Sequence, residues 1–253
     1  MLDVAAVRAL LGGTRFHDVH LVAQTSSTND DVLPLLARAD PTPHTIVAEH
    51  QTQGRGRKNR HWLSEPGKSL LWTTTLPPVP VTSLWAIPFW VALRVAEGIT
   101  EATSIAVALQ WPNDILLDGR KLAGILCVSR VHDAEAVVGC GVGLNFSRPE
   151  KNFDLEQPAA FLYDYAQTTR EQVLACILHS FHQEFEMLFT PTDVARAWEQ
   201  RARLAGTTYR ILLDGTSQPF TATAKSLDPQ GSLVVYEGDQ ERTIHLGDAR
   251  IIR

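Results

Sequence analysis

A basic, glycine-rich segment at residues 54–62, with the sequence GRGRKNRHW, carries the side chains best suited to holding an anionic ligand. Glycine amides can approach and cradle an anion, and arginine donates forked pairs of hydrogen bonds that fit phosphate or carboxylate oxygens. The indole of Trp62 offers a flat face on which a base can stack. Taken alone, such a segment is more typical of a solvated basic loop, and an RNA-binding patch would look the same.

A second candidate is the motif WPND at residues 111–114, followed by RKLAGIL at residues 120–126. The proline would end a strand and leave Asn113 and Asp114 at the strand edge. Lys121 follows an Asp-Gly hairpin turn and can point back to the same edge. An amide, an acid and an amine that converge there can bind a nucleotide, an acyl group and a magnesium ion. The alternative is a hairpin with a capping Asp and an exposed Lys.

The third candidate is GCGVGLN at residues 139–145, in a predicted strand. Its alternative interpretation is a strand whose glycines only allow close packing. Two common nucleotide motifs are absent. Leu144 stands where a dinucleotide fingerprint needs glycine, and Trp62 stands where a P-loop ending at Ser69 needs glycine.

The amino-acid composition limits which classes of protein this chain can belong to. The 253 residues are 44% hydrophobic and 20% charged, which suits a globular chain with a sizeable core. A net charge of −5 argues against general affinity for nucleic acid. Three scattered cysteines, Cys127, Cys140 and Cys176, fit reduced core residues rather than a disulfide framework. The chain shows no signal peptide and no membrane-length apolar run, so we expect a soluble, cytoplasmic protein.

Helix and strand patterns alternate up to about residue 204, and hairpins argue against a purely parallel sheet. The expected helices are 28–39, 85–97, 169–189 and 193–204, and the expected strands are 45–49, 69–76, 105–110, 115–117, 121–128 and 136–145. From Gly206 the chain changes to short strands at 209–213, 220–227, 233–236 and 243–246, separated by turn residues. We therefore expect an α+β domain at residues 1–204 and a small barrel at residues 205–253.

Six motifs in order resemble the biotin–protein ligase family from about residue 20 to the C-terminus. They are Ser27-Thr28-Asn29, Glu49-His50-Gln51, GRGR with Arg60 and Trp62, WPND, RKLAGIL and GxGxN. Each motif is weak alone, but the set in this order is specific.

The resemblance implies a catalytic domain similar to class II aminoacyl-tRNA synthetases, with a mixed sheet and helices, followed by an SH3-like β-barrel. It implies that biotin and ATP form biotinoyl-5′-adenylate, which then acylates a lysine of a biotin carboxyl carrier protein, a subunit of acetyl-CoA carboxylase. ATP and magnesium are the implied cofactors, with Mg²⁺ held mainly by the ATP phosphates. The oligomeric state is left open, a homodimer included.

The resemblance also implies roles for individual residues. The biotin-binding residues would be Ser27, Thr28, Asn29, Gln51, Arg55, Gly56, Arg57, Lys121 and Gly124. The ATP- or adenylate-binding residues would be Arg57, Arg60, Trp62, Asn113, Lys121 and Asn145, and the catalytic residues would be Arg57, Lys121 and Asp114. In the family the basic loop orders over the ligand, which would keep water from a hydrolysable anhydride.

Two positions depart from the family pattern: Gln110 replaces a lysine before WPND, and Asn59 replaces a glycine in the loop. The 26 residues before Ser27 are fewer than the roughly sixty that an independent winged helix needs, so we expect no DNA-binding or repressor function. Two rival functions stay open, a lipoate–protein ligase with the same fold and chemistry and an RNA-binding protein. The negative net charge counts against the second rival.

Overall fold

The computed structural model describes residues 1–38, 42–151, 153 and 157–252. Its main element is an eight-stranded mixed sheet with the order β1-β2-β3-β8-β7-β6-β5, in which β4 also pairs with β8. Only the β1–β2 pair is parallel among the pairings of these described strands. The strands are β1 Val19–Val22, β2 Thr45–Ala48, β3 Ser69–Thr75, β4 Val79–Pro80, β5 Ala108–Gln110, β6 Asp114–Leu117, β7 Arg120–His132 and β8 Glu135–Asn145.

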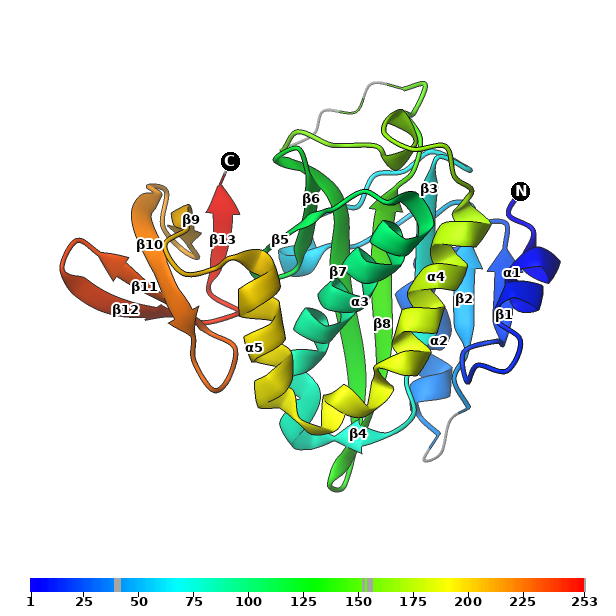
Figure 1. Ribbon diagram of the computed structural model, residues 1–253, viewed down its shortest axis with the longest axis horizontal. Helices are drawn as coiled ribbons and strands as arrows, with labels where there is room; N and C mark the ends of the chain where they lie inside the picture. Colours follow the sequence, from blue (N-terminus) through cyan, green and yellow to red (C-terminus); the bar gives the residue numbers. More distant parts are fainter. Residues whose placement is uncertain (39–41, 152, 154–156, 253) are drawn as a thin grey trace.

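Helices cover both faces of this sheet. Figure 1 shows α3 and α4 side by side across one face, with α5 and α1 at its two sides. The N-terminal end of α2 packs on β3 and β8 from the other face. The helices are α1 Val4–Leu10, α2 Thr28–Leu36, α3 Ile87–Thr103, α4 Arg170–Gln183 and α5 Pro191–Ala202, and 3₁₀ turns lie at Arg57–Asn59, Val81–Ala86, Leu162–Asp164 and Phe185–Phe189. No helix in the described part of the chain has the length and apolarity to cross a membrane.

The two-residue period of β8 separates the core from the functional face. Its larger residues Val138, Cys140, Val142 and Leu144 belong to the hydrophobic core, on the face opposite to α2. The alternate residues are Gly139, Gly141 and Gly143, and a side chain at any of them would collide with Val32, Asn29 or Trp62 respectively. The glycines therefore make room for α2 and for the indole of Trp62, rather than only for packing between strands.

The C-terminal part forms a second, five-stranded antiparallel sheet with the order β12-β11-β10-β9-β13. It lies beside α5, at the end of the molecule opposite the N-terminus (Figure 1). The indole Nε1 of Trp111 donates to the Gly231 carbonyl at 3.3 Å, which ties the two sheets together. A closed barrel and a boundary at residue 205 both stay predictions. The strands are β9 Thr208–Leu213, β10 Phe220–Leu227, β11 Leu233–Glu237, β12 Gln240–Ile244 and β13 Ala249–Ile252.

The predicted mixed sheet with flanking helices is confirmed, but several expectations about elements are wrong. The helix expected over 85–97 spans Ile87–Thr103, and the strand expected over 105–110 spans only Ala108–Gln110. The helix expected over 169–189 ends at Gln183, and a 3₁₀ turn follows it. The Trp90 indole donates a hydrogen bond to the Glu184 carbonyl and the Ser83 hydroxyl donates one to the Leu188 carbonyl, which favours this turn over a continued helix. The strand expected at 243–246 occupies Gln240–Ile244 instead. The patterns also missed α1, β1, β4 and β13, which are short elements stabilised mainly by tertiary packing. The expected end of the first helix at residue 39 lies outside the described residues.

Candidate functional site

A cavity of about 750 Å³ opens between the start of α2, the basic loop at residues 54–62 and the glycine face of β7 and β8. Almost every site residue expected from the sequence lines it. These are Ser27, Thr28, Asn29, Gln51, Arg55, Gly56, Arg57, Arg60, Trp62, Asn113, Lys121, Gly124 and Asn145. Asp114 does not line the cavity, but its carboxylate lies 2.7 Å from the Lys121 amine.

One wall of the cavity is a neutral hydrogen-bonding cluster at the start of α2. The Thr28 amide donates to Gln51 Oε1 at 2.8 Å, and the Thr28 hydroxyl donates to the same oxygen at 3.1 Å. The Thr73 hydroxyl lies 2.8 Å from Asn29 Oδ1, and Asn29 donates to the Leu126 carbonyl at 3.1 Å. Because these residues are buried and mutually oriented, the wall presents fixed donors and acceptors to a polar, uncharged group.

The basic loop at residues 54–62 closes on itself. The Gly56 amide donates to the Arg60 carbonyl at 2.7 Å, and the Trp62 amide donates to the Gly54 carbonyl at 2.8 Å. Lys58 at the tip of the loop has a positive φ of 57°. Its amine forms an ion pair at 2.5 Å with Asp214, which lies in the connection between β9 and β10. At the other side, Arg55 forms an ion pair with Asp30 of α2. The loop is thus anchored to α2 on one side and to the turn after β9 of the C-terminal sheet on the other.

Asn59, the position at which a glycine was expected, belongs to the 3₁₀ turn of this loop. Lys58, its neighbour, takes the left-handed backbone conformation. The effect of Asn59 on activity stays a prediction.

The indole of Trp62 lies on a floor made of two paired glycines. Gly124 of β7 and Gly143 of β8 face each other in register. A methyl group at Gly143 would lie 2.6 Å from Trp62 Cε2, and one at Gly124 would lie 3.0 Å from Trp62 Cζ3. The glycines therefore set the position of Trp62, whose indole Nε1 is buried and has no hydrogen-bond partner among the described residues.

We expect Gly143→Ala to push Trp62 out of this position. If Trp62 stacks on an adenine base, as the family resemblance implies, the variant should bind an adenine nucleotide about 5- to 150-fold more weakly, the range of one lost stacking contact. Titration of the intrinsic tryptophan fluorescence with ATP measures the effect. Gly247→Ala is the matched control, because an added methyl group there meets nothing within 4 Å. Unchanged nucleotide affinity in Gly143→Ala would show that the position of Trp62 is irrelevant to binding.

Lys121 is held at the centre of the site by its backbone and its side chain. Its amide donates to the Pro158 carbonyl, and its own carbonyl accepts from Ala160. The same carbonyl accepts from the Asn145 side chain at 3.1 Å. The amine contacts Asp114 and lies 5.6 Å from the centre of the Trp62 ring. The Lys121 amine is therefore held in advance where it can bind an anionic group of a ligand next to the Trp62 ring.

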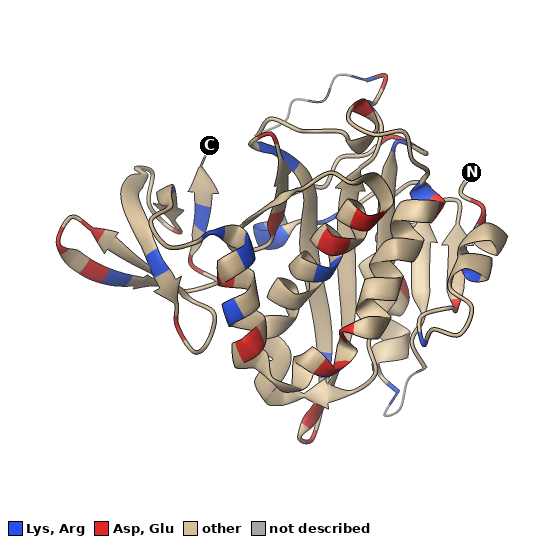
Figure 2. Ribbon diagram, in the orientation of Figure 1, with Lys and Arg blue, Asp and Glu red and all other residues tan. Residues whose placement is uncertain are grey.

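The cavity is strongly cationic although the chain carries a net charge of −5. Among the described residues that line it, one is a carboxylate, Glu65, and seven are cations: Arg55, Arg57, Arg60, Lys68, Lys121, Arg148 and Lys151. In Figure 2 the acidic positions are spread over helices, strands and turns, and four of the seven cations pair with described acids outside the lining: Asp30, Glu150, Asp114 and Asp164. Such a cavity suits a ligand with several negative charges.

The charges around Arg57 also favour an anionic ligand in the cavity. Burial lowers the pKa of its guanidinium, and the neighbouring charge of Arg60 lowers that pKa further, whereas Asp114 and Asp214 raise it. The guanidinium still carries its proton, because arginine stays charged in proteins. A half-buried cation next to another cation is stabilised when an anion binds, since the anion offsets the repulsion between the two cations.

Sequence reasoning missed several residues of this site. Lys68, Arg148 and Lys151 add cations, and Phe153 and Phe161 add aromatic surface. Lys68 stands just before β3, and its carbonyl accepts from Phe146 beyond the end of β8, so it lies beside Asn145 only because these strands pair. The cations at 148 and 151 follow the GxGxN motif closely, and that proximity is the one sequence signal that pointed to them.

Comparisons with known proteins agree with the motifs. Residues 21–145 match the model of the biotin/lipoate A/B protein ligase family. The chain is 29% identical to a biotin–[acetyl-CoA-carboxylase] ligase of Mycobacterium tuberculosis, with 100% of this chain and 96% of that protein covered. It is 30% identical to the bifunctional ligase/repressor BirA of Bacillus subtilis, with 93% and 73% covered.

A solved structure shares the fold. It is the biotin protein ligase from Aquifex aeolicus in complex with biotin and ATP, with a TM-score of 0.75 and 22% sequence identity. The likeness covers 94% of this chain and 100% of that chain.

Proposed function

The chain belongs to the biotin/lipoate A/B protein ligase family, and on that premise we propose that it converts biotin and ATP to biotinoyl-5′-adenylate and transfers the biotinoyl group to a lysine of a biotin carboxyl carrier protein. The observation that carries the proposal is the cavity, in which a neutral hydrogen-bonding wall adjoins a cluster of cations around Lys121. The wall suits the uncharged ureido head of biotin, and the cations suit its carboxylate and the ATP phosphates.

In the first step, a biotin carboxylate oxygen attacks the α-phosphorus, and the bond to the β-phosphate oxygen breaks to release pyrophosphate. Both reactants are anions, so the approach is repulsive unless cations offset it. Lys121 reaches the carboxylate and the α-phosphate, Arg57 covers both, and Arg60 and Asn113 hold the phosphates. Trp62 and Asn145 contact the adenylate, and the loop that carries Arg55 and Gly56 keeps water from the anhydride.

In the second step, the amine of the carrier lysine attacks the acyl carbon, and AMP leaves. Asp114 accepts the proton of this amine, either directly or through Lys121, which it contacts. Its place behind Lys121, and not in the cavity wall, supports the indirect route. Magnesium would be held mainly by the nucleotide phosphates and would offset their charge, since the described lining includes a single carboxylate, Glu65.

Incubation of the protein with biotin, ATP and magnesium tests the proposal. Mass spectrometry is expected to detect biotinoyl-adenylate, and addition of a carrier domain is expected to give a biotinylated lysine. Lipoate in place of biotin tests the rival ligase function, and we expect no pyrophosphate exchange with it. Folded protein that forms no biotinoyl-adenylate would refute the proposal, and exchange with lipoate alone would favour the rival.

We also propose that the described chain has no repressor activity. Residues 1–26 contribute α1 and β1, and β1 is a strand of the main sheet rather than part of a separate DNA-binding unit. The net charge of −5 also disfavours a duplex. Fluorescence anisotropy with a library of labelled duplexes tests this, and sequence-specific binding would overturn it. A cytoplasmic location and a homodimer stay predictions.

The departure at Gln110 gives a further prediction. Gln110 is buried at the end of β5, in register with Asp114. Because seven other cations already line the cavity, we expect Gln110→Lys to change the adenylation rate by less than about tenfold, which corresponds to about 1.4 kcal/mol. Pyrophosphate release under single-turnover conditions measures the rate. A gain of several orders of magnitude would show that the natural residue impairs the first step.

A further inference from the structure

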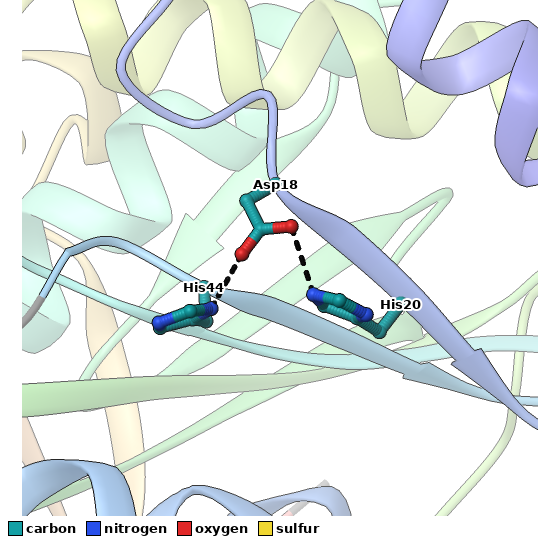
Figure 3. Close-up of side chains that lie close together, drawn as sticks. All are labelled: Asp18, His20 and His44. Atoms are coloured by element: carbon teal, nitrogen blue, oxygen red, sulfur yellow. Dashed lines mark ion pairs between the residues drawn. The ribbon is translucent and has the colours of Figure 1, made fainter.

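Two histidines and an aspartate lie together at the edge of the main sheet, outside the cavity. Figure 3 shows the Asp18 carboxylate between the rings of His20 and His44. Asp18 Oδ1 lies 2.8 Å from His20 Nε2, and Asp18 Oδ2 lies 2.5 Å from His44 Nδ1. One ligand atom from each of the three residues lies within 4.8 Å of the other two. None of the three residues lines the cavity.

The pairing of β1 with β2 brings these residues together. Val19 and Thr45 are partners in this parallel pair, so the residues before them, Asp18 and His44, are also neighbours. The Thr45 amide donates to the Asp18 carbonyl at 2.9 Å. His20 follows Asp18 by two residues and therefore points to the same face of the sheet. The ligand atoms thus come from a hydrogen-bonded sheet and not from a loose loop.

The backbone of His44 is held on its other side as well. Its amide donates to the Thr75 hydroxyl at 2.8 Å, and its carbonyl accepts from the Thr75 amide at 2.8 Å. Only side-chain rotation is then needed to bring the three ligands to a common ion. Tetrahedral zinc with bonds of about 2.0–2.2 Å separates its ligand atoms by about 3.4 Å. The Asp–His separations here are 2.5 and 2.8 Å and all three ligand atoms lie within 4.8 Å of one another, so small rotations bring them to that spacing.

We propose that Asp18, His20 and His44 form a binding site for a divalent transition-metal ion, with zinc as the best match. Two imidazoles and one carboxylate are ligands that zinc prefers, and three protein ligands leave one coordination position open. The side chains of His20, Asp18 and His44 are 52%, 30% and 22% exposed, so an ion reaches them from solvent without entering the cavity. A bound ion would cross-link the edge strand β1 to β2.

The test is calorimetric titration of the full chain with zinc chloride, without biotin or nucleotide. We expect saturation at one ion per chain and a higher melting temperature, because an ion that binds only the folded chain stabilises it. His20→Ala, His44→Ala and Asp18→Asn should each weaken zinc binding by at least about tenfold, since even partners behind a metal ligand contribute that much. The matched control is His17→Ala, which removes an exposed imidazole that contacts the Thr14 carbonyl and lies outside the cluster.

Two further measurements make the result unambiguous. Cobalt substituted for zinc should give the visible bands of nitrogen and oxygen ligands without thiolate charge transfer, which excludes the three cysteines. Anomalous diffraction at the zinc edge locates the ion in the wild-type protein and decides the matter even if a variant fails to fold. The proposal is overturned if the ion lies elsewhere, if the three variants bind zinc as the wild type does, or if His17→Ala loses binding equally. In each of these cases the cluster is an Asp–His ion-pair network only.

Discussion

Lys121→Met is expected to slow biotinoyl-adenylate formation by about 10²–10³-fold, the loss seen when one preorganised donor to a developing charge is removed. Methionine keeps an unbranched chain of similar length but removes the charge. The Lys121 amine lies 2.7 Å from Asp114, and both side chains are largely buried, at 21% and 13% exposure. Because the neighbouring loop and sheet hold this cation in place before ligands bind, its loss should reduce the rate more than the affinity for biotin.

Single-turnover formation of the adenylate, followed by mass spectrometry, gives the rate, and calorimetry gives the affinity for biotin. Lys225→Met is the matched control, because Lys225 also pairs with an acid, Glu241, but lies on the exposed surface of the C-terminal sheet. We expect this control to keep the wild-type rate, since exposed ion pairs contribute little. A Lys121→Met rate within about threefold of the wild type would remove Lys121 from the mechanism.

Removal of Lys121 also leaves Asp114 without this partner, and the structural cost must be separated from the chemical one. We therefore include the double variant Lys121→Met with Asp114→Asn. Neutralising Asp114 should restore part of any lost stability, because the carboxylate that lost its lysine partner no longer carries a charge. It should not restore the rate, because the cation is still missing. Recovery of the rate in the double variant would mean that the single variant failed for structural reasons.

Glu49→Gln is expected to lower the free energy of unfolding by about 3–5 kcal/mol at neutral pH, the cost of breaking a buried ion pair on one side. Arg170 donates to both carboxylate oxygens of Glu49, at 3.0 and 3.1 Å, and both side chains are nearly buried. The Leu2 amide donates to the same carboxylate at 2.5 Å. The pair joins the start of α4 to the end of β2, two residues before Gln51.

The same pair predicts how stability depends on pH. Burial alone would raise the pKa of Glu49, but the hydrogen bonds from Arg170 and Leu2 and the charges of Arg170 and the N-terminus outweigh it, so the pKa is lowered. A lowered carboxyl pKa in the folded state stabilises the protein above the unfolded value of about 4.3, and this contribution is lost as the pH falls through the folded value. The gap between wild type and Glu49→Gln should therefore shrink below about pH 4.

Urea denaturation at several pH values measures both effects. Glu186→Gln is the control, because Glu186 is 75% exposed and its contact with Arg15 is 3.5 Å long. We expect a change of less than about 1 kcal/mol for this variant. If Glu49→Gln were as stable as the control at pH 7, the Arg170–Glu49 ion pair would not stabilise the fold. A gap that stayed constant into acid would show that the carboxylate charge is not its source.

The elements of the catalytic part followed largely from local patterns. The period of apolar residues, the helix caps near Ser27 and the Asp-Gly turn before Lys121 placed helices and strands within a few residues of where they lie. The helix expected to continue past Gln183 is the clearest error. Its end is set by hydrogen bonds from Ser83 and Trp90, about a hundred residues away in the chain, which no local pattern contains.

The sequence by itself determined which residues are candidates for the chemistry, because the order of six motifs was specific, and the structure gathers most of these candidates around one cavity. Only the tertiary structure decided how these candidates lie relative to one another. Strand pairing placed Lys68 beside Asn145, set Asp114 behind Lys121, and turned alternate glycines of β8 toward Asn29 and Trp62. The physical reason is that side-chain type is local, whereas convergence depends on register and sheet order between segments far apart in the chain.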